Sequence, residues 1–304
     1  MTKKVLVCNP IADEAIKMLE EADLKVDREF GMSKEELTKR VPPYHALIVR
    51  SSTKVRKPTI DAANNLEAIG RPGIGLDNID VDYAEEKGIS VFNTPTATTI
   101  SVAELAMTHI LAAYRNIVAG TNSLREEKWI KSELKSNELY KKTLGIVGYG
   151  NIGQTVAERA TAFGMDIVAY DVREIEDPSP AKMVDMDTLL KESDVITIHV
   201  PHIEPTHHML SDDEFKKMKK SAVLVDPSRG GVVDEEALYK ALKDGEIRFA
   251  SKDVFEEEPP GDNPLFELDN FHATPHIGAQ TEEGQIRAGT QAAEQVIEEL
   301  EQRG

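Results

Sequence analysis

Gly148-Tyr149-Gly150-Asn151-Ile152-Gly153 stands near the middle of a chain of 304 residues. The five residues before it, TLGIV, form an apolar run typical of a buried strand, and apolar residues at helical spacing follow it up to Phe163. Three glycines at this spacing are common by chance, but a position between a strand and a helix is typical of a dinucleotide-binding turn. The stretch therefore predicts an α/β domain of the Rossmann type.

Each glycine of this turn has its own physical role. Gly148 permits the tight turn, Gly150 lets a pyrophosphate approach the backbone, and Gly153 lets the helix pack closely on the strand. Free N–H groups at the start of the helix then point at the phosphates. The competing interpretation is an ordinary glycine turn in a protein that binds no nucleotide.

An acidic residue ends the next expected strand, Asp166 to Tyr170. Asp171 follows Gly153 by 18 residues, where a carboxylate accepts hydrogen bonds from the adenosine ribose diol and repels a 2′-phosphate. This arrangement favours NAD over NADP as cofactor, although Arg173 is close enough to leave NADP open.

Length and composition narrow the class of protein. The length suits two domains, and a hydrophobic content of 40% is enough to bury both cores. A net charge of −18 opposes binding to nucleic acid and to anionic membranes. The chain has no apolar run of the ~20 residues that span a membrane, and its N-terminus lacks a signal-peptide pattern. The single cysteine, Cys8, is typical of a small buried hydrophobe, so we expect a cytoplasmic protein.

Strand and helix patterns alternate through two regions of the chain. The first 95 residues predict a small parallel α/β domain, and one long helical stretch follows from about Ile100 to about Glu126. A second α/β domain starts near Thr143. The closing helix, from about Thr281 to Gln302, lies beyond its nucleotide-binding pattern, so we expect that helix to return to the first domain. The expected domains are residues 1–97 with 279–304, and residues 98–278.

Three side chains that suit redox chemistry on a carboxylic acid follow the glycine turn. Arg229 comes directly after an expected strand, where open α/β sheets bind ligands, and its guanidinium can hold the carboxylate of a 2-keto acid. His276 follows the last short strand and can donate the proton that a nascent alkoxide needs. Glu258 is the candidate carboxylate to orient this imidazole. Taken alone, Arg229 would be a surface ion-pair residue and His276 a structural histidine.

The chain resembles the D-2-hydroxyacid dehydrogenase family over nearly its whole length. The matching stretches are GRPGIGLDN from Gly70, TISVAEL from Thr99, the glycine turn, Arg229 to Gly231 with Val233 and Asp234, Asp253 to Phe255 with Glu258 and Pro259, and Thr274 to His276. The resemblance implies two doubly wound parallel-sheet domains: a flavodoxin-like substrate domain and an inserted Rossmann domain that binds NAD. It also implies a homodimer formed through the nucleotide domain and the long helix.

The resemblance assigns roles residue by residue. Arg229 would bind the substrate, His276 would be the acid/base, and Glu258 would pair with His276. Asp253 would hold the nicotinamide carboxamide. The other expected cofactor-binding residues are Gly148, Tyr149, Gly150, Asn151, Ile152, Gly153, Asp171 and Pro201. The expected substrate-binding residues are Arg50, Ser51, Arg71, Gly73 and Ile74, the last two through backbone N–H groups that face the substrate carboxylate.

Within the family, the stretch Val49 to Val55 is most similar to the D-3-phosphoglycerate dehydrogenases. Four basic residues fall within eight positions of this acidic chain, namely Arg50, Lys54, Arg56 and Lys57. Such a patch suits a phosphate group on the substrate, and the alternative is a solvated loop and helix start. We therefore expect 3-phosphoglycerate and 3-phosphohydroxypyruvate as substrates, with a place in serine biosynthesis. The competing functions are a glyoxylate or hydroxypyruvate reductase and an NAD-sensing binding protein of the corepressor type.

Some positions depart from the family pattern: Asp226, Pro227 with Ser228, Lys252, and Thr96 in the hinge. Asp226 and Lys252 end consecutive expected strands. An acid and a base that occur together in this way predict a compensating ion pair.

A group of histidines, His199, His202, His207 and His208, could suggest a metal site. Their spacing fits no closed zinc pattern, and hydride transfer needs no metal. We therefore expect a loop without metal.

Overall fold

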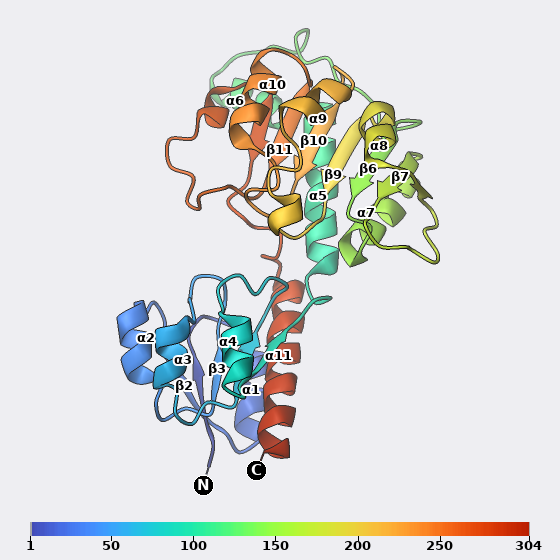
Figure 1. The fold of residues 1–304 in the computed structure, drawn as a ribbon. Helices are drawn as coiled ribbons and strands as arrows, with labels where there is room; N and C mark the ends of the chain where they lie inside the picture. Colours follow the sequence, from blue (N-terminus) through green and yellow to red (C-terminus); the bar gives the residue numbers. More distant parts are fainter. Residues whose placement is uncertain (1, 304) are drawn as a thin grey trace. The chain divides into compact units, whose positions relative to one another are not determined.

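The computed structural model describes residues 2–303, which divide into two compact units. Unit 1 contains the chain up to Thr98 and from Ala279 onward, and unit 2 is Thr99–Gly278 (Figure 1). Among residues 2–303, no helix is long and apolar enough to cross a membrane.

Unit 1 is built on a five-stranded parallel sheet in the order β2-β1-β3-β4-β5, the flavodoxin-like order. Its strands are β1 (Lys4–Val7), β2 (Lys25–Arg28), β3 (Ala46–Ile48), β4 (Ala68–Arg71) and β5 (Ser90–Asn93). Its helices are α1 (Asp13–Glu21), α2 (Lys34–Arg40), α3 (Lys57–Ala62), α4 (Val81–Glu86) and α11 (Glu282–Gln302). The closing helix α11 lies against α1 and β4 (Figure 1).

Alternation along the strands builds a core on each face of this sheet. Leu6, Leu47 and Ile69 pack in one apolar cluster with residues of α2, α3 and α4. Their strand neighbours, such as Val5 and Ile48, pack in a second cluster with α1 and α11. Since successive side chains of a strand point to opposite faces, a parallel sheet covered by helices on both faces needs apolar residues at nearly every position.

Unit 2 is built on a seven-stranded parallel sheet in the order β12-β11-β10-β9-β6-β7-β8. Read from β8, this is the Rossmann order with one further strand, β12. The strands are β6 (Thr143–Val147), β7 (Asp166–Tyr170), β8 (Lys182–Met183), β9 (Val195–Ile198), β10 (Val223–Asp226), β11 (Phe249–Lys252) and β12 (Phe271–Ala273). The helices are α5 (Thr99–Arg115), α6 (Ile117–Arg125), α7 (Asn151–Ala162), α8 (Met186–Glu192), α9 (Asp212–Lys217) and α10 (Glu235–Lys243), with 3-10 turns at Glu204–Thr206 and Pro264–Glu267. The expected architecture of two doubly wound sheets is confirmed.

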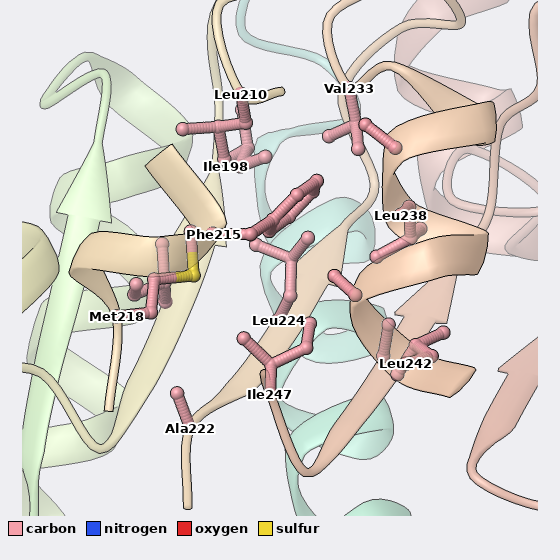
Figure 2. Packing of buried hydrophobic residues seen from close by; sticks show 14 of the residues in the cluster. Ile198, Leu210, Phe215, Met218, Ala222, Leu224, Val233, Leu238, Leu242 and Ile247 are labelled. Carbon is pink, nitrogen blue, oxygen red and sulfur yellow. The ribbon is translucent and has the colours of Figure 1, made fainter. Parts of the chain in front are cut away.

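The core of unit 2 also has two parts. Helices α5 and α7 cover one face of the sheet, and α8, α9 and α10 cover the other. On the second face the ring of Phe215 lies at the centre of the cluster, with Ile198, Leu224 and Leu238 around it (Figure 2). This packing fixes the carboxyl ends of β9 and β10, from which two of the expected site loops start.

The helical stretch expected from about Ile100 to about Glu126 is confirmed, but it is divided into two helices. Asn116 separates α5 from α6 and adopts a left-handed backbone with φ +52°. Asparagine tolerates this conformation better than most residues, because its short polar side chain hydrogen-bonds locally. Here the Asn116 amide donates to the carbonyl of Lys135 (3.0 Å) and to the hydroxyl of Ser136 (3.2 Å).

Candidate functional site

The expected site residues of unit 2 follow the carboxyl ends of neighbouring strands. The glycine turn follows β6, Pro201 follows β9, Arg229 follows β10, Asp253 follows β11 and His276 follows β12. These five strands are consecutive in the sheet, and the chain order reverses between β6 and β9. This switch point is where open α/β sheets bind ligands.

The glycine turn has the shape that a pyrophosphate needs. A Cβ on Gly148, whose φ is +91°, would lie 2.5 Å from the carbonyl oxygen of His199, and one on Gly153 would lie 2.3 Å from that of Gly148. At Gly150 the nearest atom to such a Cβ is the Arg173 Nη2 at 3.5 Å, so this position is open. Gly150 is also the N-cap of α7. The turn thus leads to a helix N-terminus through glycines that have no side chains of their own, which fits a dinucleotide phosphate.

The Asp171 carboxylate is held by its neighbours at the end of β7. It accepts the backbone N–H groups of Tyr149 and Arg173, both at 2.9 Å, and the Arg173 guanidinium donates to both of its oxygens at 3.0 Å. The Arg173 side chain, together with these backbone groups, holds the pKa of Asp171 below its ordinary value against the effect of burial. Asp171 is therefore an ionised acceptor beside the glycine turn, and Arg173 competes for it.

The turn that carries Arg229 rests on a buried ion pair. Asp226 and Lys252 are opposite each other in β10 and β11, and both side chains have no exposed surface. Lys252 Nζ lies 3.0 Å from Asp226 Oδ2, while Asp226 Oδ1 accepts the backbone N–H and the hydroxyl of Ser228. Arg229 in turn donates to the Ser228 carbonyl at 2.7 Å. The predicted compensating pair is confirmed, and it fixes the residues that precede Arg229.

His276 and Glu258 are brought together by two loops of unit 2. His276 Nδ1 lies 2.8 Å from Glu258 Oε2 and 3.0 Å from Oε1. His276 has a left-handed backbone, φ +52°, and its N–H donates to the Asp253 carbonyl at 2.8 Å. Because a carboxylate only accepts, Nδ1 carries the proton of this contact, and Nε2 is the atom left to exchange a proton with a ligand.

The charge state of Glu258 follows from its contacts. Burial raises the pKa of this carboxyl, but the His276 hydrogen bond and charge, the Phe255 N–H and the Arg229 guanidinium outweigh burial and hold it below its ordinary value. Phe255 N–H donates to Glu258 Oε1 at 3.2 Å. Arg229 is close enough for its charge to act here, partly because the glycine after it permits close packing: a Cβ on Gly230 would lie 1.7 Å from the Phe255 carbonyl oxygen. The structure thus gathers Arg229, Glu258 and His276 in one unit.

The carboxylate of Asp253 is bound by the loop that leads to His276. It accepts the Thr274 hydroxyl at 2.6 Å, the Ile277 N–H at 2.8 Å and the Gly278 N–H at 2.8 Å. Its carbonyl accepts the N–H of His276. Asp253 therefore anchors the histidine loop as well as being a candidate to hold a carboxamide.

The expected substrate-binding residues of unit 1 follow β3 or lie at and after the end of β4. Asn9 accepts the Arg50 N–H at 2.6 Å and donates to the Ser52 hydroxyl at 2.8 Å, which fixes the loop that contains Ser51. Arg50 Nη1 contacts the Pro10 carbonyl at 3.5 Å, and burial lowers the pKa of this guanidinium.

One role expected in unit 1 was wrong. The Gly73 N–H donates to the buried Thr94 hydroxyl at 2.7 Å, so it does not face a substrate carboxylate. Gly73 has φ +138°, and a Cβ there would lie 1.4 Å from the Arg71 Nη1. The positive φ favours glycine whatever the Arg71 side chain does, and this accounts for the residue without ligand binding. Binding of a substrate carboxylate by the Ile74 N–H stays a prediction.

The basic patch of unit 1 is smaller than the sequence predicted. Arg56 donates to Asp80 at 2.8 Å and to the Asp77 carbonyl at 2.9 Å, and Lys57 lies over the ring of Tyr83. These two charges are engaged within the unit. Arg50 and Lys54 remain as the candidates for a phosphate.

Three of the four histidines of the 199–208 stretch make contacts among themselves or with acids. His199 contacts the Thr197 hydroxyl instead, and burial lowers its pKa to about 3. His202 and His207 lie 3.0 Å apart, and His208 contacts Glu256 at 3.1 Å. Within residues 2–303, no group of three histidine, cysteine, aspartate or glutamate side chains could hold a metal ion.

Two polar residues next to Asp253 were missed by the sequence reasoning. His109 on α5 and Ser251 on β11 are buried and lead through Thr274 to the Asp253 carboxylate. No sequence pattern indicates a role for Ser251. A histidine on the apolar stripe of α5 does indicate one, because it is a buried polar group and such groups require hydrogen-bond partners.

The chain matches the family model of the D-isomer specific 2-hydroxyacid dehydrogenase NAD binding domain over residues 107–278. It is 50% identical over 297 residues to a D-3-phosphoglycerate dehydrogenase of Methanocaldococcus jannaschii, which covers 96% of this chain and 56% of that relative. It is also 50% identical over 301 residues to a hydroxypyruvate reductase of Thermotoga maritima, covering 98% of each. The chain thus spans about half the length of the first relative and nearly all of the second.

A solved structure is similar over nearly the whole length. The D-lactate dehydrogenase of Aquifex aeolicus, in complex with NAD and lactic acid, has a TM-score of 0.86 and is 31% identical, with 99% of this chain and 97% of that chain covered.

Proposed function

The chain belongs to the D-isomer specific 2-hydroxyacid dehydrogenase family, and we propose that it transfers a hydride between NAD and C2 of a D-2-hydroxy acid or the matching 2-keto acid. The observation that carries the proposal is the 2.8 Å contact between His276 Nδ1 and Glu258 Oε2 in the unit that contains the glycine turn. A protein that only senses the dinucleotide would have no need of this acid/base pair.

The residues of unit 2 supply the cofactor contacts in this proposal. The N-terminus of α7 and the backbone at Gly150 bind the pyrophosphate. Asp171 accepts hydrogen bonds from the ribose diol, which replaces the Arg173 guanidinium at this carboxylate. Asp253 accepts a hydrogen bond from the nicotinamide carboxamide. Tyr149, Asn151, Ile152 and Pro201 line the same strand ends.

The acid/base residues act on the substrate oxygen and carboxylate. The His276 Nε2 donates a proton to the oxygen of the keto acid, or takes it from the hydroxy acid in the reverse direction. Glu258 fixes the ring through Nδ1 and stabilises its charged form. Arg229 binds the substrate carboxylate, and its guanidinium polarises the adjacent carbonyl.

For the substrate, we place 3-phosphoglycerate and 3-phosphohydroxypyruvate first. In unit 2, Arg229 would bind the substrate carboxylate; in unit 1, Arg50 and Lys54 are the residues that we propose for a second anionic group. Half-burial of Arg50 in a chain of charge −18 favours an anionic partner, because a partly desolvated guanidinium gains most from a bound anion. The similarity to the phosphoglycerate dehydrogenase supports the same choice.

Hydroxypyruvate is the second candidate, and one observation favours it. The hydroxypyruvate reductase matches this chain end to end, whereas the phosphoglycerate dehydrogenase is much longer. Initial rates of NADH oxidation with 3-phosphohydroxypyruvate, hydroxypyruvate, glyoxylate and pyruvate distinguish the two. The first proposal requires that the wild type has its highest kcat/KM with 3-phosphohydroxypyruvate. It also requires that Arg50→Ala lowers kcat/KM more for this acid than for hydroxypyruvate. A preference for hydroxypyruvate, or equal losses on both, contradicts it.

A homodimer formed through unit 2 is part of the proposal. Apolar side chains on and after α6 are exposed, and Trp129 is 80% exposed. A hollow of about 660 Å³ lies among them, lined by Ile117, Leu124, Ile130 and Leu134 with other residues of this stretch. Contiguous exposed apolar surface of this kind marks an interface, and a second copy of the chain is the partner that we propose. Light scattering should give twice the chain mass, and Leu124→Asp with Trp129→Asp should reduce it to one.

A cytoplasmic location is also proposed. The thiol of Cys8 is buried, and burial, with a contribution from Glu29, raises its pKa to about 12. Such a thiol behaves as a small core residue, which fits a reducing compartment.

A further inference from the structure

A line of polar side chains crosses the core of unit 2 and ends at the Asp253 carboxylate. Ser251 Oγ lies 2.6 Å from His109 Nδ1, and His109 Nε2 lies 3.0 Å from Thr274 Oγ1. The Thr274 hydroxyl lies 2.6 Å from Asp253 Oδ1. His109 is 6% exposed, Ser251 is 0% exposed, and Asp253 is 1% exposed.

The direction of every hydrogen bond in this line follows from its last member. An ionised carboxylate only accepts, so the Thr274 hydroxyl donates its one proton to Asp253. The Thr274 oxygen then accepts from His109, which places the ring proton on Nε2. In the neutral ring the His109 Nδ1 is then the acceptor, and the Ser251 hydroxyl donates to it. The line thus has one consistent direction, from Ser251 to Asp253, with His109 neutral.

The surroundings of His109 favour the neutral ring. Its helix neighbours Ala106, Ile110 and Ala113 belong to an apolar cluster with β10, β11 and α7. The charge of Asp253 favours the protonated ring, and His109 in turn contributes to lowering the pKa of His272. Burial is the largest influence and lowers the pKa of His109.

The bonds to Asp253 leave one acceptor position of its carboxylate unused. A carboxylate has about four acceptor positions. Thr274, Ile277 and Gly278 fill three of them, and no further donor to this carboxylate occurs among residues 2–303. The direction in which the unused acceptor position of Asp253 points depends on the Thr274 hydroxyl. This hydroxyl would rotate away from Asp253 if His109 did not donate a hydrogen bond to the Thr274 oxygen.

We propose that His109 and Ser251 are positioning residues that fix the Thr274 hydroxyl and, through it, the acceptor position of Asp253 that recognises the nicotinamide carboxamide. The proposal rests on the cofactor role proposed above for Asp253. Its particular claim is that polar groups in the core, on α5 and β11, contribute to recognition of the nicotinamide end of the cofactor and not of its adenosine end.

Two ligands that differ only at that end provide the test. NADH carries the nicotinamide, whereas ADP-ribose shares the pyrophosphate and adenosine but has no carboxamide. Isothermal titration calorimetry gives Kd for both on the wild type, Thr274→Val, Thr274→Ser and His109→Leu. Thr161→Val is the matched control, because Thr161 lies on α7 and donates only to the Ala157 carbonyl.

Thr274→Val should raise the Kd for NADH about tenfold, since one hydrogen bond to a charged group is lost. The Kd for ADP-ribose should not change. His109→Leu should act in the same direction, Thr274→Ser should restore binding, and Thr161→Val should change neither Kd. Equal losses on both ligands, or no loss on NADH, overturn the proposal. A wild type that binds neither ligand contradicts the proposed function instead.

A second measurement tests the line of hydrogen bonds without any cofactor. In ¹⁵N-labelled wild-type protein at pH 7, long-range ¹H–¹⁵N spectra should show His109 neutral with the proton on Nε2, assigned by its absence in His109→Leu. A proton on Nδ1, or a charged ring, contradicts the direction of the hydrogen bonds from Ser251 to Asp253, whatever the protein binds.

Discussion

Asp226 and Lys252 form an ion pair 3.0 Å long with no exposed surface on either side chain, and this pair supports the turn before Arg229. Lys252→Met would leave a buried carboxylate without its charge partner. We expect a loss of about 3–5 kcal/mol in the free energy of unfolding. Calorimetry checks this, and the double variant Asp226→Asn with Lys252→Met should recover most of the loss, because it removes both charges. A single variant as stable as the wild type would contradict the assignment.

Two glycines of the same turn should respond differently to alanine. Gly150→Ala places a Cβ at φ −84° in ordinary van der Waals contact with Arg173 Nη2, so the melting temperature should not change while NADH binding weakens. Gly153→Ala forces a Cβ to within 2.3 Å of the Gly148 carbonyl oxygen, so it should lower the melting temperature as well. Thermal melts and NADH titrations of the two variants make the comparison. Equal effects on stability would mean that Gly150 has a packing role.

The pairing of Asp171 with Arg173 leads to a prediction about cofactor choice. Asp171→Ala removes the acceptor for the ribose diol and releases a guanidinium that can bind a 2′-phosphate. The preference for NADH over NADPH should therefore narrow, mainly through KM. Arg173→Ala keeps the carboxylate and should retain the preference. Faster turnover of NADPH than NADH by the wild type would refute this view of Asp171.

The pH dependence of the reduction should depend on Glu258. Because the pKa of Glu258 is held low, this residue stays ionised below the pH at which an ordinary glutamate takes up a proton. Its charge stabilises the protonated ring of His276, which keto acid reduction requires. Glu258→Gln keeps the size but removes the charge, so the rate should begin to fall at a lower pH than in the wild type. An unchanged profile of kcat against pH would remove Glu258 from this role.

Most of the fold could be predicted from the sequence. Most strands of both sheets are buried and appear as apolar runs, and the expected bounds of every strand except β8 lie within about two residues of those in the structure. The break at Asn116 could not be seen, because asparagine in a helical pattern has only a small propensity penalty. Strand β8, which is only two residues long, and helix α8 were not expected either.

The site was predictable where chemistry follows a strand end, and not where it depends on distant partners. Arg229, Glu258 and His276 fall near motifs that fix their place, and unit 2 brings all three together. The engagement of Gly73 by Thr94 and of Arg56 by Asp80 links residues more than 20 positions apart, and no local pattern indicates it. The same holds for His109, whose partner Ser251 is 142 residues away.

The central claim is that this chain is an NAD-dependent dehydrogenase in which His276 is the acid/base. The most direct measurement compares kcat for NADH-dependent reduction of 3-phosphohydroxypyruvate and hydroxypyruvate in the wild type and in His276→Ala, with NADH Kd measured in parallel. We expect a fall in kcat of about 10²-fold or more with nearly unchanged NADH binding. A variant within a few-fold of the wild type, or a wild type that oxidises NADH with neither acid, would contradict the claim.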